Sequence, residues 1–167
     1  LNADPSKCNT PVLGANVVPA PGTPLAPSGA VPYLRPWVVK DFGGERVGII
    51  GIDIAQKTQV SSSPLPTTAF LDEVTTVQRN VDAREALGID KSGVLSHSPD
   101  ANDVALAAQV TGVDLIVGGD SHSPLGDFGI LPISSEGAYP TQVTDAAGVP
   151  VCVVQAWDDA SIVGELN

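Results

Sequence analysis

Hydrophobic and polar positions along the chain follow two periods, one typical of strands and the other typical of helices. Short apolar runs rich in β-branched residues predict strands at 11–18, 37–42, 46–52, 93–96, 113–117, 139–144, 149–156 and 161–166. The Gly43-Gly44 pair between the second and third runs predicts a β-hairpin. The sixth and seventh runs predict another hairpin.

Apolar residues recur at intervals of three and four between 71 and 87, which predicts an amphipathic helix that Gly88 ends. Thr67 or Thr68 is the expected N-cap of this helix. A second helix is predicted from residue 99 to about 110, preceded by a capping Ser98. Because it joins the strands 93–96 and 113–117, a right-handed crossover would make those strands parallel. The proline-rich and polar segments 19–32 and 53–68 are expected to be loops.

The stretch 113–123, VDLIVGGDSHS, ends a buried strand at two glycines and then presents an acid, a hydroxyl and an imidazole. Asp120 and His122 therefore fall beyond the carboxyl end of a strand, where open α/β sheets bind their ligands. His97 follows the strand 93–96 in the same way, so parallel strands would bring the three side chains to one edge. Imidazole and carboxylate are common metal ligands, which makes a metal site one hypothesis. A polar loop with structural histidines is the alternative.

Composition limits the possible functions. A length of 167 residues with 43% hydrophobic residues indicates one globular domain. The net charge of −11 argues against a nucleic acid polymer or an anionic membrane as partner. No apolar run reaches the roughly 20 residues that a transmembrane helix needs. Cys8 and Cys152 are compatible with a disulfide or with two separate thiols.

Five runs of sequence resemble a known family. They are PVLGANV, VVKDFGGERVGIIGI, DEVTTVQRNVD, VLSHSPDANDVALAAQVTGVDLIVGGDSHS and VPVCVVQAWDDASIVGELN. They are similar to the later part of the catalytic domain of 5′-nucleotidases of the calcineurin-like metallophosphoesterase superfamily. The resemblance implies an α/β (α+β) fold, with residues 1–167 as part of a four-layered α-β-β-α sandwich. It also implies two divalent metal ions, whether zinc, manganese, calcium or magnesium.

The resemblance assigns three metal ligands, which are not the acid, base or nucleophile. His97 matches a family histidine that binds one metal ion, and Asp120 stands where the family more often has a histidine bound to the same ion. His122 matches a ligand of the other ion. A carboxylate in place of imidazole would favour harder cations.

Other parts of the family pattern are missing. The Gly-Asn-His-Glu motif does not occur in the 167 residues, nor does a nucleoside-binding C-terminal domain. The chain starts at Leu1 and contains no methionine, so we expect a mature or excised piece of a longer protein. The isolated chain is expected to be inactive.

The expected function of the parent protein is metal-dependent hydrolysis of phosphomonoesters, with nucleotides as the expected small-molecule substrates. Its expected location is secreted, periplasmic or on the cell surface, and the remainder of its own polypeptide is an expected partner. The alternative is a non-catalytic binding or structural fragment. A Ser-His-Asp hydrolase ranks last, because the serines near His97 and His122 lie in no Gly-x-Ser-x-Gly motif.

Overall fold

A six-stranded mixed sheet forms the centre of the molecule in the computed structural model, which describes residues 10–27 and 32–166. Its strands, in order across the sheet, are β4 (Trp37–Phe42), β5 (Glu45–Ile52), β7 (Lys91–Ser96), β8 (Leu115–Val117), β10 (Pro150–Val154) and β9 (Thr141–Thr144). The four central strands are parallel, and each edge strand runs antiparallel to its neighbour. This confirms the mixed α/β class, both hairpins and the parallel pairing of the two strands that the second predicted helix joins.

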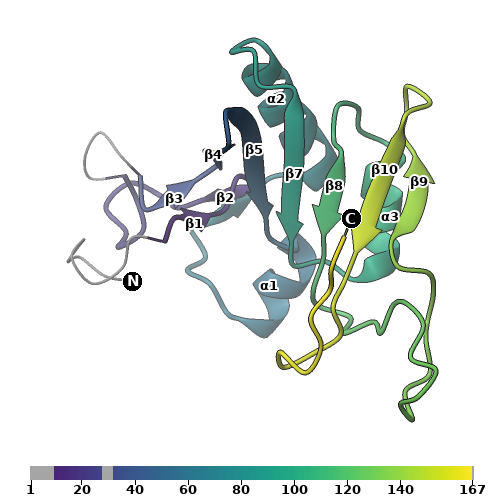
Figure 1. The fold of residues 1–167 in the computed structure, drawn as a ribbon. Helices are drawn as coiled ribbons and strands as arrows, with labels where there is room; N and C mark the ends of the chain where they lie inside the picture. Colours follow the sequence, from purple (N-terminus) through teal and green to yellow (C-terminus); the bar gives the residue numbers. More distant parts are fainter. Residues whose placement is uncertain (1–9, 28–31, 167) are drawn as a thin grey trace.

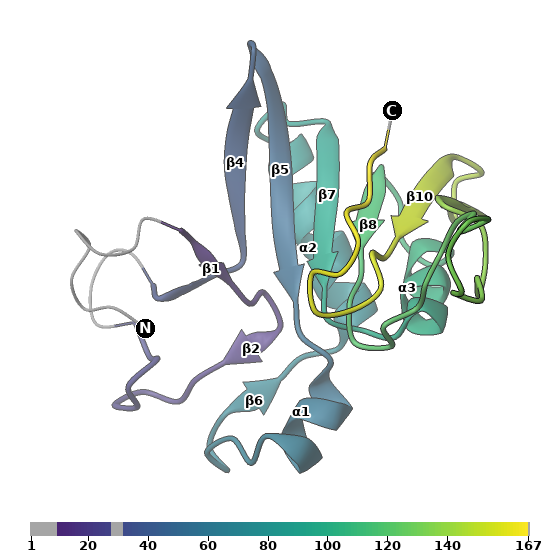
Figure 2. The same cartoon turned by 60° about the horizontal axis from the view of Figure 1, so that its bottom comes forward.

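Two helices cover one face of this sheet, as Figures 1 and 2 show. They are α2 (Glu73–Glu85) and α3 (Asp100–Ala107). Neighbouring strands place a row of aliphatic side chains under them, and each is fully buried: Ile50, Val94, Ile116 and Val153. Val77 and Val81 of α2 are equally buried against this row. The hydrophobic core therefore lies between the helices and the sheet.

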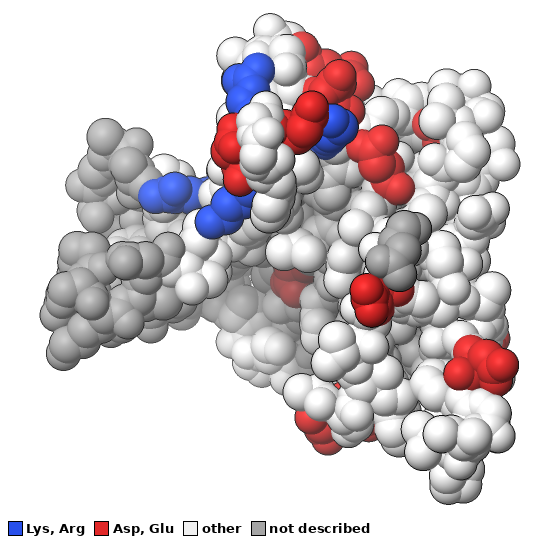
Figure 3. Space-filling view, in the orientation of Figure 1, with Lys and Arg blue, Asp and Glu red and all other residues white. Residues whose placement is uncertain are grey.

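The opposite face of the sheet has no helix over it in the described residues (Figure 2). Strand pairing aligns Ile49, Leu115 and Cys152 on this face, and all three are half-buried. Leu95, also on this face, is 47% exposed. Figure 3 shows the face from the front: basic and acidic side chains gather together around the β4–β5 hairpin, and mostly uncharged areas with a few acids occupy the rest. The sheet thus offers a second apolar surface.

Short elements surround the first strands. β1 (Val12–Leu13) pairs with β3 (Leu34–Arg35), and β2 (Val17–Val18) pairs with β6 (Ala69–Phe70). The predicted strand 11–18 is therefore two strands, because the chain turns between them. Leu13 packs over Gly51, where a β-carbon would lie only 2.2 Å from its side chain.

Four further predictions of secondary structure are wrong. The predicted loop 53–68 contains the helix α1 (Ala55–Ser61), which has no buried residue and so carries no apolar period. Residues 161–166 form no strand.

Two predicted helix caps also differ. The N-cap of α2 is Asp72 rather than Thr67 or Thr68. The N-cap of α3 is Pro99, with no side-chain hydrogen bond, so Ser98 does not cap this helix.

No helix within residues 10–27 and 32–166 has the length and apolar content needed to cross a bilayer. Cys8 lies outside the described residues, so its pairing with Cys152 is not tested.

The cap of α2 gives a first testable prediction. Asp72→Ala should lower the free energy of unfolding by about 1 kcal/mol, because the carboxylate accepts a hydrogen bond from the Thr75 N–H at 2.8 Å. The same bond lowers the pKa of Asp72, so its contribution is present at neutral pH and is lost as the pH falls through that lowered pKa. Urea titration at neutral and acidic pH measures both effects. Thr67→Ala is the control; an equal loss in both variants would contradict the assignment of the cap.

Candidate functional site

His97 and Asp120 lie side by side, as the parallel strands predict. His97 follows the last residue of β7, and its N–H donates to the Ile52 carbonyl oxygen at 3.2 Å. Asp120 follows β8, the neighbouring strand. The distance from His97 Nε2 to Asp120 Oδ1 is 3.7 Å. Gly119 leaves the room for this approach, because a β-carbon there would lie 3.2 Å from His97 Nδ1.

Lys57 of α1 completes this part of the site, and the sequence analysis missed it. Its ammonium group forms an ion pair and hydrogen bond with Asp120 Oδ1. The Asp120 side chain is only 8% exposed, so the lysine neutralises a carboxylate that water hardly reaches. Asn16 steadies the segment leading to α1: its side chain donates to the Asp53 carbonyl at 2.7 Å and accepts from the Asp53 N–H at 3.0 Å.

His122 belongs to a second pair. Its backbone is in the left-handed region with φ 54°, and its N–H donates to Gly119 O at 3.1 Å, which closes a tight turn. This turn directs the imidazole toward Asp158, with 3.9 Å between Nδ1 and Oδ2. Asp158 is a site residue that the sequence analysis also missed.

The donor set fits part of a metal site. Two ligand atoms on one tetrahedral zinc ion, each bound at about 2.1 Å, lie about 3.4 Å apart. The 3.7 Å between His97 and Asp120 is closer to this spacing than to a hydrogen bond of about 2.9 Å. Both imidazoles are well exposed, at 66% for His97 and 59% for His122. Within the described residues, however, no three side chains of the types His, Cys, Asp and Glu converge on one point. Each pair can therefore supply two ligands and needs others.

The serines around the histidines do not form a hydrolytic triad in the described part of the chain. The Ser96 hydroxyl accepts from the Ser98 N–H at 3.0 Å. The Ser121 hydroxyl accepts from the Asp100 N–H at 3.0 Å and contacts the Ser123 hydroxyl at 3.0 Å. These hydroxyls bond to the loop and to α3 rather than to an imidazole base, so the geometry offers no activated serine.

A buried carboxylate, Asp103 of α3, lies beneath the loop of residues 118–123 that carries Asp120 and His122. Burial raises the pKa of Asp103 to about 7; Asp100 adds to the rise and the Ser96 hydroxyl opposes it. Asp103 is fully buried, and neither of its carboxylate oxygens has a hydrogen-bond partner among the described residues. It was not found from the sequence, where it appears as one acid in an ordinary helix.

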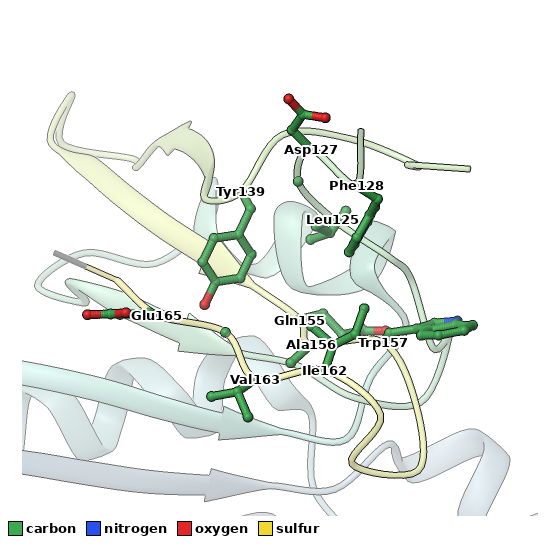
Figure 4. A pocket seen from close by; sticks show the side chains of 12 residues that line it. Leu125, Asp127, Phe128, Tyr139, Gln155, Ala156, Trp157, Ile162, Val163 and Glu165 are labelled. Carbon is green, nitrogen blue, oxygen red and sulfur yellow. The ribbon is translucent and has the colours of Figure 1, made fainter. Parts of the chain in front are cut away.

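A pocket of about 320 Å³ adjoins the loop (Figure 4). Phe128, Tyr139 and Trp157 line it together with the C-terminal segment, and Gln155, which also lines it, accepts a hydrogen bond from the Ser123 N–H of the loop. Aromatic rings of this kind suit a planar ring more than a phosphate group. The carboxylates of Asp127 and Glu165 in the lining would also repel a phosphate.

The raised pKa of Asp103 gives a second prediction. The folded state holds a proton up to about pH 7 that the unfolded state releases near 3.8, so the contribution of Asp103 to stability is greatest below 3.8 and falls as the pH rises to about 7. Asp103→Asn removes this titration. The free energy of unfolding of the variant, relative to wild type, should therefore rise by roughly 3 kcal/mol from about pH 4 to about pH 8. Urea titrations across this range measure the difference; a difference independent of pH would contradict the assignment.

Comparison with known proteins identifies related chains. The chain matches no protein-family model. It is 38% identical over 159 residues to a probable 5′-nucleotidase of Treponema pallidum, a match that takes in 94% of this chain and 26% of that protein.

Solved structures agree with this relationship. A 5′-nucleotidase precursor from Thermus thermophilus superimposes with a TM-score of 0.84 at 40% identity, over 92% of this chain and 29% of its own. The NAD nucleotidase of Haemophilus influenzae does so with a TM-score of 0.81 at 34% identity, over 88% of this chain and 28% of its own. The chain thus spans a little more than a quarter of the length of these relatives. Sequence and fold together show that it is homologous to one part of the 5′-nucleotidases, the family that its motifs resemble.

Proposed function

We propose that the protein containing this chain is a metal-dependent phosphomonoesterase that acts on nucleotides. The observation that carries the proposal is the pairing of His97 with Asp120 at neighbouring strand ends, 3.7 Å apart, in a chain homologous to 5′-nucleotidases. An exported location is part of the same proposal.

The metal ligands in this proposal are His97 and Asp120 for one cation and His122 for the other. A bound divalent cation polarises a phosphoryl oxygen and neutralises the charge that builds on the phosphate. The role of this chain is to hold the donor atoms. Gly119 makes room for the His97 ring, Asp158 faces the Nδ1 of His122 and leaves its Nε2 free, and Lys57 balances Asp120 until a cation arrives.

Residues 1–167 make up part of a catalytic domain in this proposal. The apolar face of the sheet that no described helix covers supports it, because half-buried Ile49, Leu115 and Cys152 are suited to packing against further structure. The remainder of the polypeptide would form the other half of the four-layered sandwich and supply the missing ligands.

One observation favours the alternative, a non-catalytic binding or structural fragment. The described residues provide two pairs of candidate ligands rather than a complete set around one ion, and Asp120 already forms an ion pair with Lys57. Such a chain alone would bind divalent cations weakly.

Substitution of Asp120 in the complete protein tests the ligand assignment. Asp120→Ala should lower bound Mn²⁺ and turnover per folded molecule by at least about tenfold, because His97 would be left without its partner. Asp120→His should be milder and should shift preference toward zinc. Elemental analysis and nucleotide hydrolysis assays measure both quantities.

Asp90→Ala is the matched control, since it removes the same charge just before β7, at the opposite end of the sheet. If Asp120 only shapes a turn, its variants should cost about 0.5–2 kcal/mol of stability and retain metal and turnover. Unchanged metal content and turnover in both Asp120 variants would remove this residue from the site.

The 167-residue chain in isolation gives a further prediction. Its hydrolysis of a nucleoside monophosphate should stay near the uncatalysed background, with or without added Mn²⁺, because two-metal catalysis needs both cations held together. Phosphate release measures the rate, and the complete protein is the positive control. Fast hydrolysis by the isolated chain that a chelator abolishes would show that it is a complete enzyme.

A further inference from the structure

Two buried polar side chains beneath the loop 118–123 lack partners that burial normally requires. Asp103 is 0% exposed and Gln155, which follows β10, is 2% exposed. In the described part of the chain, no group makes a hydrogen bond of good geometry to either oxygen of Asp103, although the Ser96 hydroxyl is near enough to oppose the rise of its pKa, and no group accepts a hydrogen bond from Nε2 of Gln155. A buried polar group without a partner costs about 1–3 kcal/mol, and more when it is charged. Packing alone does not explain why these groups are there.

The unpaired atoms converge on Gly118, where β8 passes into the loop. A β-carbon on Gly118 would lie 2.3 Å from Asp103 Oδ2 and 3.3 Å from Gln155 Nε2. The Gly118 N–H donates to the Val154 carbonyl at 2.8 Å, which holds the backbone against β10. A glycine is therefore required here so that the loop can lie directly against the carboxylate.

The orientation of the Gln155 amide is fixed by its other end. Its Oε1 accepts a hydrogen bond from the Ser123 N–H, and the Ser121 hydroxyl donates to it at 3.3 Å. Because a backbone N–H can only donate, the oxygen must face Ser123. The NH₂ group then faces the Gly118 side, which is where the Asp103 carboxylate lies. No hydrogen bond joins the two groups, but above its pKa of about 7 the negative charge of Asp103 favours the orientation with the NH₂ group toward it over the flipped form.

The held residues flank the proposed metal ligands. Ser121 and Ser123 lie on either side of His122, and Gly118 lies two residues before Asp120. Ser121 is also tied to the first turn of α3, the helix that carries Asp103, through the Asp100 N–H. The loop is thus fixed from below at three of its six residues.

We propose that Asp103 and Gln155 are positioning residues for the metal-binding loop: the carboxylate sets the orientation of the Gln155 amide, and the amide holds Asp120 and His122 in place. The proposal rests on the proposed metal site for its functional part. The support of the loop itself does not depend on metal.

Swapping the carboxylate and the amide between positions 103 and 155 tests the proposal in the complete protein. Asp103→Asn removes the negative charge that orients the amide and leaves a neutral group that can present either its oxygen or its NH₂, and Gln155→Glu sets two carboxylates against each other. The double variant Asp103→Asn/Gln155→Glu restores the match, because the new carboxylate at 155 can accept from Ser123 N–H while the new amide at 103 donates to its other oxygen. Asp114→Asn is the matched control: that carboxylate accepts from the Ser92 N–H at 2.7 Å, at the opposite end of β8.

Two measurements separate support of the loop from metal binding. Hydrogen exchange of the 118–124 peptide in chelator should quicken in Asp103→Asn and return toward wild type in the double variant. The Mn²⁺ dissociation constant should rise about tenfold in Asp103→Asn and recover in the double variant, whereas the control changes neither.

Two results would overturn the inference: hydrogen exchange of the 118–124 peptide that is unchanged in Asp103→Asn, or hydrogen exchange in the double variant that is at least as fast as in Asp103→Asn. The expected exchange pattern in a protein that binds no Mn²⁺ would uphold the support of the loop and refute the proposed function. If Gln155→Glu does not fold, exchange in Asp103→Asn and the double variant still decides between the outcomes.

Discussion

The parallel pairing of β7 with β8 is the constraint on which the candidate site depends. α3 is the crossover between these strands, so it brings their carboxyl ends to the same edge and places His97 beside Asp120. The fully buried aliphatic row beneath the helices fixes the strand register. A shift by one residue would turn the apolar row out of the core and carry His97 away from Asp120. The packing that stabilises the sheet therefore also sets the distance between two donor atoms.

Two buried charged side chains at opposite ends of the sheet differ in the number of hydrogen bonds that they make. Away from the site, the guanidinium of Arg84 is fully buried and donates to the Asn80 carbonyl and the Ser92 hydroxyl, and it fills the space over Gly48; only its Nη2 has no partner among the described residues. Near the site, Asp103 is buried without such partners. The first arrangement is that of a structural charge. The second reduces stability locally, and residues of this kind are common where a site must be held in a particular shape.

The sequence alone predicted the features that depend on the spacing of apolar residues and on the relative direction of neighbouring strands. The hairpins, α2 and the proximity of His97 to Asp120 follow from apolar periods and one crossover. Lys57 could not be found because α1 has no buried residue, and hence no apolar period marks it. Asp158 lies far from His122 in sequence, and only the tertiary fold brings the two together. Residues 161–166 have the composition of a strand, yet Gly164 packs against Tyr139 and the segment pairs with no edge of the sheet.

The ion pair between Lys57 and Asp120 bears on the order in which the loop folds and binds metal. A loop whose carboxylate is already balanced by an ammonium group can take its final shape before any metal binds. A divalent ion bound at the proposed site would displace this ammonium group and would find the loop already formed. Folding and metal binding would then be separate steps, and only the second would depend on metal.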